Sequence, residues 1–505
     1  MSGAHAHPAV LVLDCGATNV RALAIDVTGK LLHMEARPNA PVLQAKGKPW
    51  LVWDLEGIWA KLIVCARNTV SVVGRESIVA LVVTSFSDDG APIDRKGKLL
   101  YPVISWQCRR TIGMAESLDA ILALTEIYAI TGQPALSQHT LLRLLWLRQH
   151  APGVLEKAYK YLMFPGLITY RLTEECTNDP TTADSMMLLD IRKRRYSERI
   201  LTSLDIDSGL FGILVEPGTV IAPLGDKMAD ELGLRRGIPI DAGGHDTQFA
   251  VFGSGCKSGE MVLSSGTWEI LMLRSAACKT DAAAFKADLN NECDSVPGLF
   301  DLGLQWIGSG AIEWISRIFY PQVSERAHVY RTMIGEAQEV PAGANGVMVL
   351  PSLLPMPGVF KRGTTGGTIL GCTLQTQRGE IYRALLEGLA FQLRSAVETL
   401  QDLLDMRPSC LTVVGGGAKN ALWNRIRADV TNLPIRLTCQ AENTGLGAAI
   451  FGFIGAGVYA DVDEAYSQIT FFMDSIEPGS DSKRYDYLFV KYNALGSTLD
   501  AFQSQ

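Results

Sequence analysis

The sequence has none of the cysteine and histidine patterns that mark metal-binding or disulfide-stabilised proteins. Its ten cysteines form no Cys-x-x-Cys pair, and its seven histidines are scattered without the spacing of a zinc site. No obvious signal peptide precedes the first hydrophobic run, so we expect reduced thiols and a cytoplasmic location.

Runs of one charge and membrane-length apolar runs are also missing. The 46 basic and 53 acidic residues are interleaved, which argues against nucleic acid or anionic lipid as a partner. One uncharged apolar stretch, residues 444–460, is shorter than the roughly 20 residues that cross a membrane, and its glycines favour a helix packed inside a globular core. The 505 residues, 47% of them hydrophobic, suffice for two to four domains. The sequence leaves open whether the protein forms a homo-oligomer.

A polar turn between two hydrophobic runs lies near the N-terminus. Residues 10–26 read VLVLDCGATNVRALAID, and the two hydrophobic runs predict buried strands. A further strand is predicted at residues 31–35, so no helix opens after the turn as it would in a Rossmann or P-loop site. The pattern predicts a β-hairpin whose turn is either a phosphate loop or an ordinary surface turn.

The residues of this turn suit a magnesium-phosphate ligand. Gly16 lets the backbone approach closely, Thr18 and Asn19 offer hydrogen-bond donors, and Arg21 adds a fixed positive charge. Asp14, at the end of the first strand, could hold a hydrated cation.

A second strand–turn–strand pattern follows at half the chain length. A hydrophobic run leads into Ser265, Gly266 and Thr267, and another such run comes after them. Ser264 stands 250 positions after Asp14 in a chain of 505 residues, which indicates two duplicated halves that each present a hairpin to a shared cleft. Hydroxyls and exposed amides of this turn can hold the β- and γ-phosphates opposite the first turn.

A candidate base lies some 20 residues before the second turn. Residues 238–242 predict a short strand, which Gly243, Gly244, His245 and Asp246 follow. The two glycines allow the backbone to lie close to a ligand. Asp246 could accept a hydroxyl proton as a phosphoryl group arrives, and His245 could orient a sugar hydroxyl. A His-Asp dipeptide is weak evidence alone, because it is more often structural.

Asp89 follows a third predicted strand, residues 78–84. A carboxylate at the carboxyl end of a strand is placed to accept hydrogen bonds from sugar hydroxyls. The alternative is a solvated acid in an ordinary turn.

Three consecutive glycines separate a predicted strand, residues 411–414, from a predicted helix, residues 420–430: Gly415, Gly416 and Gly417. Such a junction lets backbone amides lie against a nucleotide. Elsewhere, residues 137–149 and 380–404 predict helices, and residues 210–234, rich in glycine and proline, predict an irregular approach to a domain junction.

With these motifs the chain resembles the FGGY family of carbohydrate kinases from about residue 10 to about residue 457. The resemblance implies an α/β fold with two actin-like (ribonuclease H-like) ATPase domains, residues 1–250 and 251–505, that flank a central cleft. It also implies ATP and Mg²⁺ as cofactors, with Asp246 as the catalytic base and with Asp14 and Asp246 as metal ligands.

The resemblance extends to the substrate contacts. The glycine run and Asn420 match the segment that holds adenosine in that family, and five residues match its sugar side: Asp89, Trp106, His245, Gln305 and Trp306. The chain departs from the common Trp-x-Asp-x-Arg pattern, since Cys108 replaces the acid. A thiol there is either a less polar sugar contact or plain core. Ser87 and Asp88 likewise replace the glycine and valine of a Gly-Val-Asp motif in related deoxy-ketose kinases.

The implied reaction is phosphoryl transfer from ATP to a hydroxyl group of a ketose. Within the family the chain most resembles kinases of L-fuculose, which implies transfer to the 1-hydroxyl. Kinases of L-rhamnulose, D-ribulose or D-xylulose are alternatives, and a nucleotide-gated sugar sensor is an alternative of another class. Asp246 favours an enzyme, because a switch needs no base beside a sugar site.

Overall fold

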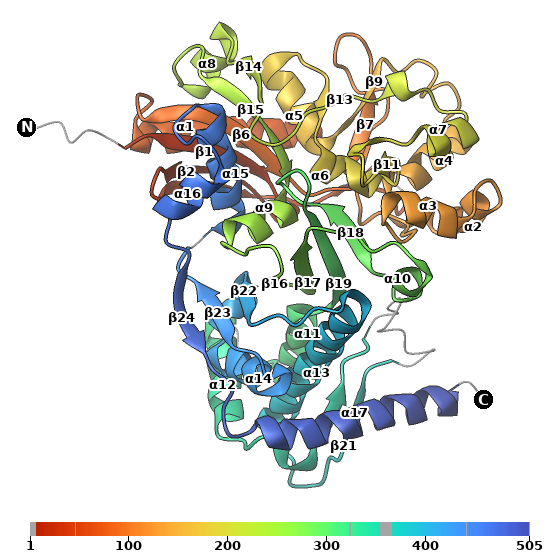
Figure 1. Ribbon diagram of the computed structural model, residues 1–505, viewed down its shortest axis with the longest axis vertical. Coiled ribbons are helices and arrows are strands. Elements are labelled where there is room, and N and C mark those ends of the chain that lie inside the picture. Colours follow the sequence, from red (N-terminus) through yellow and green to blue (C-terminus); the bar gives the residue numbers. More distant parts are fainter. Residues whose placement is uncertain (1–6, 46, 323–324, 354–365, 441, 504–505) are drawn as a thin grey trace, which may run out of the picture.

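Two β-sheets with helices packed against them form the framework of the protein (Figure 1). The computed structural model describes residues 7–45, 47–322, 325–353, 366–440 and 442–503. The strand order is β14-β15-β6-β1-β2-β3 in the first sheet and β18-β19-β17-β16-β22-β23-β24 in the second.

The first sheet contains the predicted N-terminal hairpin. Strands β1 (Ala9–Cys15), β2 (Asn19–Asp26) and β3 (Leu31–Pro38) are antiparallel neighbours. Parallel pairing adds β6 (Ile78–Ser85) beside β1, and then β15 (Pro239–His245) beside β6. The carboxyl ends of β1, β6 and β15 therefore meet at one edge, which is where the polar residues of the candidate site begin.

Helices cover both faces of this sheet, which explains why every residue of β1 is buried. Leu11 and Leu13 share a core with α1 (Leu55–Val73), whereas Val10 and Val12 share another core with α15 (Asn443–Gly455). Figure 1 shows α15 and α16 (Val462–Gln468) beside β1 and β2, although they come late in the chain. The C-terminal part of the sequence thus returns to the first sheet.

The glycines of α15 permit its close packing, as the sequence predicted. A Cβ atom at Gly447 would collide with the Phe249 carbonyl of α9 (Asp246–Gly253), and one at Gly452 would press on Val10 and Val82. Over the residues that the structure describes, no helix has both the length and the apolar character needed to cross a membrane.

The second sheet contains the second predicted hairpin. Strands β16 (Met261–Ser265) and β17 (Trp268–Ser275) are antiparallel, and β22 (Leu411–Val414) lies parallel to β16. The long predicted helix is α13 (Arg378–Leu404), which begins where the Glu380 carboxylate accepts a hydrogen bond from the Gln377 amide.

The structure differs from the prediction at residues 210–234. This segment holds α8 (Asp226–Leu232), whose seven residues are too few to produce a clear helical period between Gly225 and Gly233. The predicted boundary at residue 250 falls inside α9.

The remaining elements complete the two halves. The other strands are β4 (Val42–Leu43), β5 (Leu51–Trp53), β7 (Gly90–Ile93), β8 (Val103–Ile104), β9 (Lys160–Met163), β10 (Thr177–Asn178), β11 (Leu189–Asp190), β12 (Arg195–Tyr196), β13 (Ile213–Leu214), β14 (Val220–Pro223), β18 (Asn290–Cys293), β19 (Phe300–Ile307), β20 (Met348–Leu350), β21 (Thr368–Leu370), β23 (Ile435–Thr438) and β24 (Phe472–Ile476). The other helices are α2 (Met114–Asp119), α3 (Leu124–Thr131), α4 (Thr140–His150), α5 (Phe164–Thr173), α6 (Pro180–Ala183), α7 (Glu198–Ser203), α10 (Ala282–Lys286), α11 (Ser309–Phe319), α12 (Arg326–Gln338), α14 (Ala421–Thr431) and α17 (Ser482–Gln503).

A buried carboxyl group lies between the first sheet and α15. Asp241 on β15 is fully buried, both of its oxygens lack a hydrogen-bond partner, and a Cβ atom at Gly455 would overlap its carboxyl group. Burial raises the pKa of Asp241 to about 8. At neutral pH the folded protein therefore keeps a proton on this group that the unfolded chain, with a carboxyl pKa near 4, has lost.

We expect Asp241→Asn to raise the free energy of unfolding at pH 8 by roughly 1–3 kcal/mol, because the amide imitates the protonated acid. In the wild type, this group should make stability fall as the pH rises from about 4 to about 8, and the variant should lack that contribution. Urea unfolding at pH 5 and pH 8 measures both effects, with Asp226→Asn, a change at an exposed side chain of α8, as control. Identical pH dependence in wild type and Asp241→Asn would contradict the assignment.

Candidate active site

The first polar turn places a carboxylate–arginine pair at the end of β1. Asp14 is buried, and Arg21, its cross-strand partner on β2, donates to Asp14 Oδ2 from both Nε, at 2.8 Å, and Nη2. Arg21 Nη1 also donates to Glu442 Oε2 at 2.7 Å, just before α15. The Arg21 guanidinium, which the sequence analysis assigned to phosphate, is therefore paired with two carboxylates in this structure.

Asp14 retains one oxygen without a partner. Its Oδ1 is buried and accepts no hydrogen bond. Burial raises the pKa of Asp14 to about 6; the Arg21 charge opposes this rise and the nearby Asp246 carboxylate adds to it. A free carboxylate oxygen near a second carboxylate fits Mg²⁺, which takes one or two carboxylates together with phosphate oxygens and water. Across the described ranges no group of three or more His, Cys, Asp or Glu side chains could hold a metal. Phosphate oxygens and water would complete the coordination.

Hydrogen bonds stabilise the backbone of the turn, and polar side chains of the turn are exposed. Asn39 donates from Nδ2 to the Gly16 carbonyl at 2.9 Å and from its backbone to the Thr18 carbonyl at 2.8 Å. Thr18 and Asn19 are exposed. A Cβ atom at Gly16 would lie 2.9 Å from the Asn19 carbonyl, so glycine is required for this tight path. The geometry leaves the predicted donors accessible to a ligand.

Asp246 is the first residue of α9, directly after β15. Its side chain is 29% exposed, and His245 Nε2 lies 3.3 Å from Asp246 Oδ1. The backbone amide of His245 donates to Thr181 Oγ1 at 2.9 Å, while its buried Nδ1 has no partner. The amino-terminal end of a helix favours a negative charge at Asp246. An accessible carboxylate with a positioned imidazole beside it can accept a proton from a bound hydroxyl group.

The two glycines before His245 allow close packing of β15 inside the protein. A Cβ atom at Gly243 would overlap the Val83 carbonyl of β6, and one at Gly244 would lie 2.6 Å from Thr181 Oγ1. These glycines let β15 pack closely against β6 and α6.

The second turn and the glycine run lie side by side. A Cβ atom at Gly415 would lie 2.8 Å from the Ser265 carbonyl, and Gly417 faces the Ser265 hydroxyl, because β22 runs beside β16. Gly416 is exposed with open space around it, and Thr267 is exposed at the tip of the turn. The structure therefore brings together the two segments predicted to hold the phosphates and the adenosine.

Two other predicted nucleotide contacts have internal roles. Asn420 caps α14, because its Oδ1 accepts a hydrogen bond from the Trp423 amide at 3.1 Å. The Gly266 amide donates to the Trp268 carbonyl at 2.9 Å and so closes the turn.

Trp306, one of the predicted sugar contacts, lies inside the protein, and its sugar contact stays a prediction. It is fully buried, and its Nε1 donates to Glu269 Oε2 at 3.1 Å. Arg427 pairs with the other Glu269 oxygen and donates to Ser265 Oγ at 2.6 Å. Trp306 thus stabilises the second turn from inside the protein, through Glu269. Gln305 points to the opposite face of β19 and is exposed.

Asp89, another predicted sugar contact, points into the protein. It is fully buried, and its carboxylate accepts hydrogen bonds from Arg143 Nη1 at 2.6 Å, from the Trp106 amide at 3.0 Å and from Trp53 Nε1. Burial raises its pKa to about 6 against the opposing Arg143 charge. Donors within the protein thus bind both oxygens of Asp89 in this structure, and its sugar contact stays a prediction. Trp106 is half-buried beside it, with part of its side chain accessible.

Cys108 belongs to the core. It is buried, and its Sγ accepts hydrogen bonds from Arg110 Nε at 3.1 Å and from the Leu51 amide at 3.3 Å. Of the two interpretations of this thiol, the structure favours plain core. All ten cysteines are free.

Sequence reasoning missed four polar residues near His245. Asp88 and His139 form a pair with 2.8 Å between Oδ1 and Nδ1, and Gln248 of α9 donates to Glu292 of β18. Asp88 could have been found, because it stands beside Asp89. Nothing in the sequence links Glu292 to the base, because Glu292 lies on β18 of the second sheet and Asp246 begins α9, far away in the sequence.

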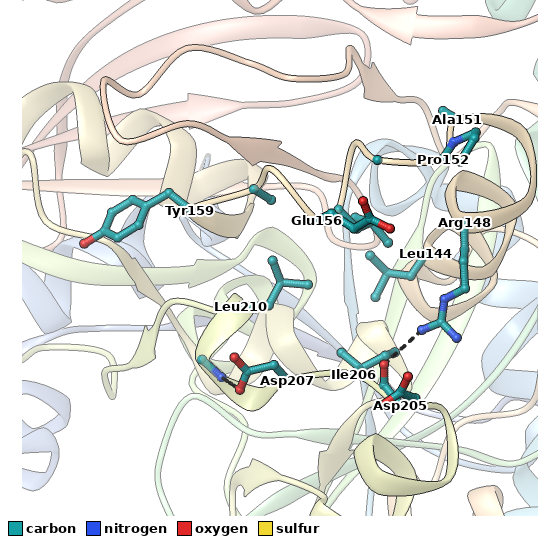
Figure 2. Close-up of a pocket in the computed structure, with 14 residues that line it drawn as sticks. Leu144, Arg148, Ala151, Pro152, Glu156, Tyr159, Asp205, Ile206, Asp207 and Leu210 are labelled. Atoms are coloured by element: carbon teal, nitrogen blue, oxygen red, sulfur yellow. Dashed lines mark hydrogen bonds between the residues drawn. The ribbon is translucent and has the colours of Figure 1, made fainter.

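The first turn with Asp246 and the second turn with the glycine run form two separate groups. Within the described ranges, no hydrogen bond or ion pair joins one group to the other. A surface cavity of about 520 Å³ lies elsewhere, between α4 and the segment around Leu210 (Figure 2). None of the predicted site residues lines that cavity.

Comparison with known families decides what these groups belong to. The model of the FGGY family of carbohydrate kinases, N-terminal domain, matches residues 9–253, and that of the C-terminal domain matches residues 261–456. The chain belongs to the FGGY family of carbohydrate kinases. It is an ATP-dependent phosphotransferase with an alcohol group as acceptor. The predicted family, reaction class and actin-like α/β fold class are confirmed.

Similar proteins share most of the chain. The L-fuculokinase of Escherichia coli (strain K12) is 40% identical over 91% of this chain and 95% of that protein. The autoinducer-2 kinase of Klebsiella pneumoniae is 25% identical over 90% of this chain and 87% of that protein. Two solved structures share the fold. Xylulose kinase from Rhodospirillum rubrum has a TM-score of 0.87 and 24% identity, over 98% of this chain and 100% of that one. Plasmodium falciparum glycerol kinase with ADP has a TM-score of 0.86 and 19% identity, over 97% of this chain and 98% of that one.

Proposed function

We propose that the protein phosphorylates L-fuculose at its 1-hydroxyl group, with ATP as donor and Mg²⁺ as cofactor. The observation that carries the substrate is the 40% identity to an L-fuculokinase over 95% of that protein, against 25% to an autoinducer-2 kinase. L-fuculokinases from Salmonella typhi and Haemophilus influenzae give similar values, 40% and 37%.

The proposed mechanism assigns the proton transfer to Asp246. Its carboxylate is accessible, and His245 lies beside it to orient the carboxylate or a sugar hydroxyl. In this mechanism Asp246 accepts the proton of the attacking hydroxyl while the γ-phosphoryl group is transferred. Bound Mg²⁺, held by Asp14 and Asp246, would neutralise charge on the phosphates.

We assign the triphosphate to residues of both halves, 1–250 and 251–505. Thr18 and Asn19 on the first turn and Thr267 on the second are exposed donors. The exposed Gly416 leaves room for adenosine beside the second turn. Because the two groups share no direct interaction within the described residues, we expect ATP to bridge them.

A panel of ketoses tests the substrate. We expect L-fuculose to give the highest kcat/KM for ADP release among L-fuculose, L-rhamnulose, D-ribulose and D-xylulose, by at least about tenfold, since differential transition-state binding sets specificity. ATP hydrolysis without sugar is the background measurement. A panel led by D-xylulose would contradict the substrate but not the kinase, whereas a nucleotide-gated sensor would release no sugar-dependent ADP.

A further inference from the structure

Asp88 is the one accessible residue in an otherwise buried segment. In residues 80–93, which run from β6 through β7, every other residue is buried. Its backbone has φ = 69°, a left-handed conformation that is uncommon for a non-glycine residue. A side chain kept accessible at a strained position, at the carboxyl end of a central strand, indicates a functional constraint.

The Asp88 backbone is held on both sides. Its amide donates to Ser185 Oγ at 2.9 Å, and its carbonyl accepts hydrogen bonds from Thr140 Oγ1 at 2.6 Å and Arg143 Nη1 at 2.7 Å. These contacts come from α4 and from the turn after α6, so two parts of the chain hold the backbone that carries this carboxylate. Such a group is preorganised, and little conformational entropy is lost when it binds a ligand.

The carboxylate itself is bound on one oxygen by His139. Its Oδ1 lies 2.8 Å from His139 Nδ1, and the Asp88 side chain keeps 16% of its surface exposed. His139 is 4% exposed, and its Nε2 is buried without a partner. A buried ring nitrogen without a partner is costly unless a ligand or water supplies the hydrogen bond.

The surroundings of Asp88 connect it to the base. Ser85, three residues before Asp88, pairs with His245 where β6 lies beside β15. Cys293, the neighbour of Glu292, donates from its backbone amide to Asp184 Oδ2 at 2.6 Å, next to the Ser185 that binds the Asp88 amide. Glu292 in turn accepts a hydrogen bond from Gln248 on α9, the helix that Asp246 begins. Three further polar atoms there are buried without partners: His245 Nδ1, Gln248 Oε1 and Asp184 Oδ1. Polar atoms without partners beside the base can bind the several hydroxyl groups of a sugar substrate.

We propose that Asp88 is the specificity-determining residue of the sugar site: its carboxylate accepts hydrogen bonds from a ketose hydroxyl other than the one phosphorylated, and His139 is its positioning residue. This inference deepens the proposed function and rests on it. The Asp89 carboxylate, by contrast, accepts hydrogen bonds from Arg143, Trp106 and Trp53 inside the protein. A ketose without that hydroxyl would leave a preorganised carboxylate unpaired, and so should be rejected.

The test compares L-fuculose with its 3-, 4- and 5-deoxy analogues on the wild type and on Asp88→Gly. Glycine suits a positive φ, so the variant removes the carboxylate without adding strain. Asp405→Gly is the matched control, because exposed Asp405 also has a positive φ, 51°, at the end of α13. Readouts are kcat and KM for each sugar, and thermal unfolding of each variant.

We expect one deoxy analogue to lose roughly 100-fold in kcat/KM on the wild type and less than about fivefold on Asp88→Gly. With L-fuculose, Asp88→Gly should raise KM more than it lowers kcat, and Asp405→Gly should match the wild type. His139→Asn should show a weaker form of the same analogue pattern. An equal loss for every analogue in both proteins, or an unchanged KM in a folded Asp88→Gly, would overturn the assignment.

The experiments distinguish a failure of the proposed function from a failure of the role proposed for Asp88. If the wild type turns over D-ribulose, D-xylulose or L-rhamnulose in place of L-fuculose, the substrate is wrong, and the same comparison with deoxy analogues of that ketose still tests Asp88. Inactivity of the wild type on all four sugars would contradict both.

Discussion

Asp246→Asn should lower kcat by roughly 10²- to 10⁴-fold while the affinity for ATP changes little, since the amide cannot accept the hydroxyl proton. The side chain is 29% exposed and the amide has the size of the carboxylate, so the variant should fold normally. Steady-state ADP release with L-fuculose gives kcat, and calorimetric titration gives the ATP dissociation constant.

Asp230→Asn is the control for this measurement, because Asp230 is 70% exposed on α8, away from the site. It should retain wild-type kcat. A folded Asp246→Asn variant with near-normal kcat would remove Asp246 as the base and leave the His245–Asp246 pair as a structural feature.

Arg427→Met should lower the free energy of unfolding by about 3–5 kcal/mol, because it leaves the Glu269 carboxylate buried without its cation. Both side chains are fully buried, and the pair lies directly beneath Ser265. Arg425→Met, on the same helix with a side chain 47% exposed, should change stability by less than about 1 kcal/mol.

The double variant Arg427→Met/Glu269→Gln separates charge from packing. Removing both charges should recover a large part of the loss, since the unpaired buried charge causes most of it. Urea unfolding measures all four proteins. Equal losses from Arg425→Met and Arg427→Met would show that the buried pair contributes nothing particular to the second turn.

The strands and long helices were predictable because their signals are local. The predicted strand at residues 411–414 is β22 with the same bounds, and the predicted helix at 380–404 is α13, which starts two residues earlier. Hydrophobic period and turn residues determine such elements without reference to the rest of the chain. The seven-residue α8 was missed because it is too short to show a hydrophobic period.

The direction of a side chain was much less predictable than its position. Asp89 and Trp306 lie beside the site, but each turns inward: Asp89 is bound by Arg143, which follows 54 positions later, and Trp306 by Glu269, 37 positions earlier. Asp88 and Gln305, the neighbours of these two residues, are the accessible ones. A shift of one residue exchanges the two faces of an extended segment, and only the tertiary partners decide which face is buried.

The most direct test of the central claim is ³¹P and ¹³C NMR of the product formed from ATP, Mg²⁺ and L-fuculose. The account predicts stoichiometric ADP and a sugar phosphate whose phosphorus couples to carbon 1, formed by the wild type and at least about 100-fold more slowly by Asp246→Asn. Inorganic phosphate with unmodified L-fuculose, or a phosphate on another carbon, would contradict it.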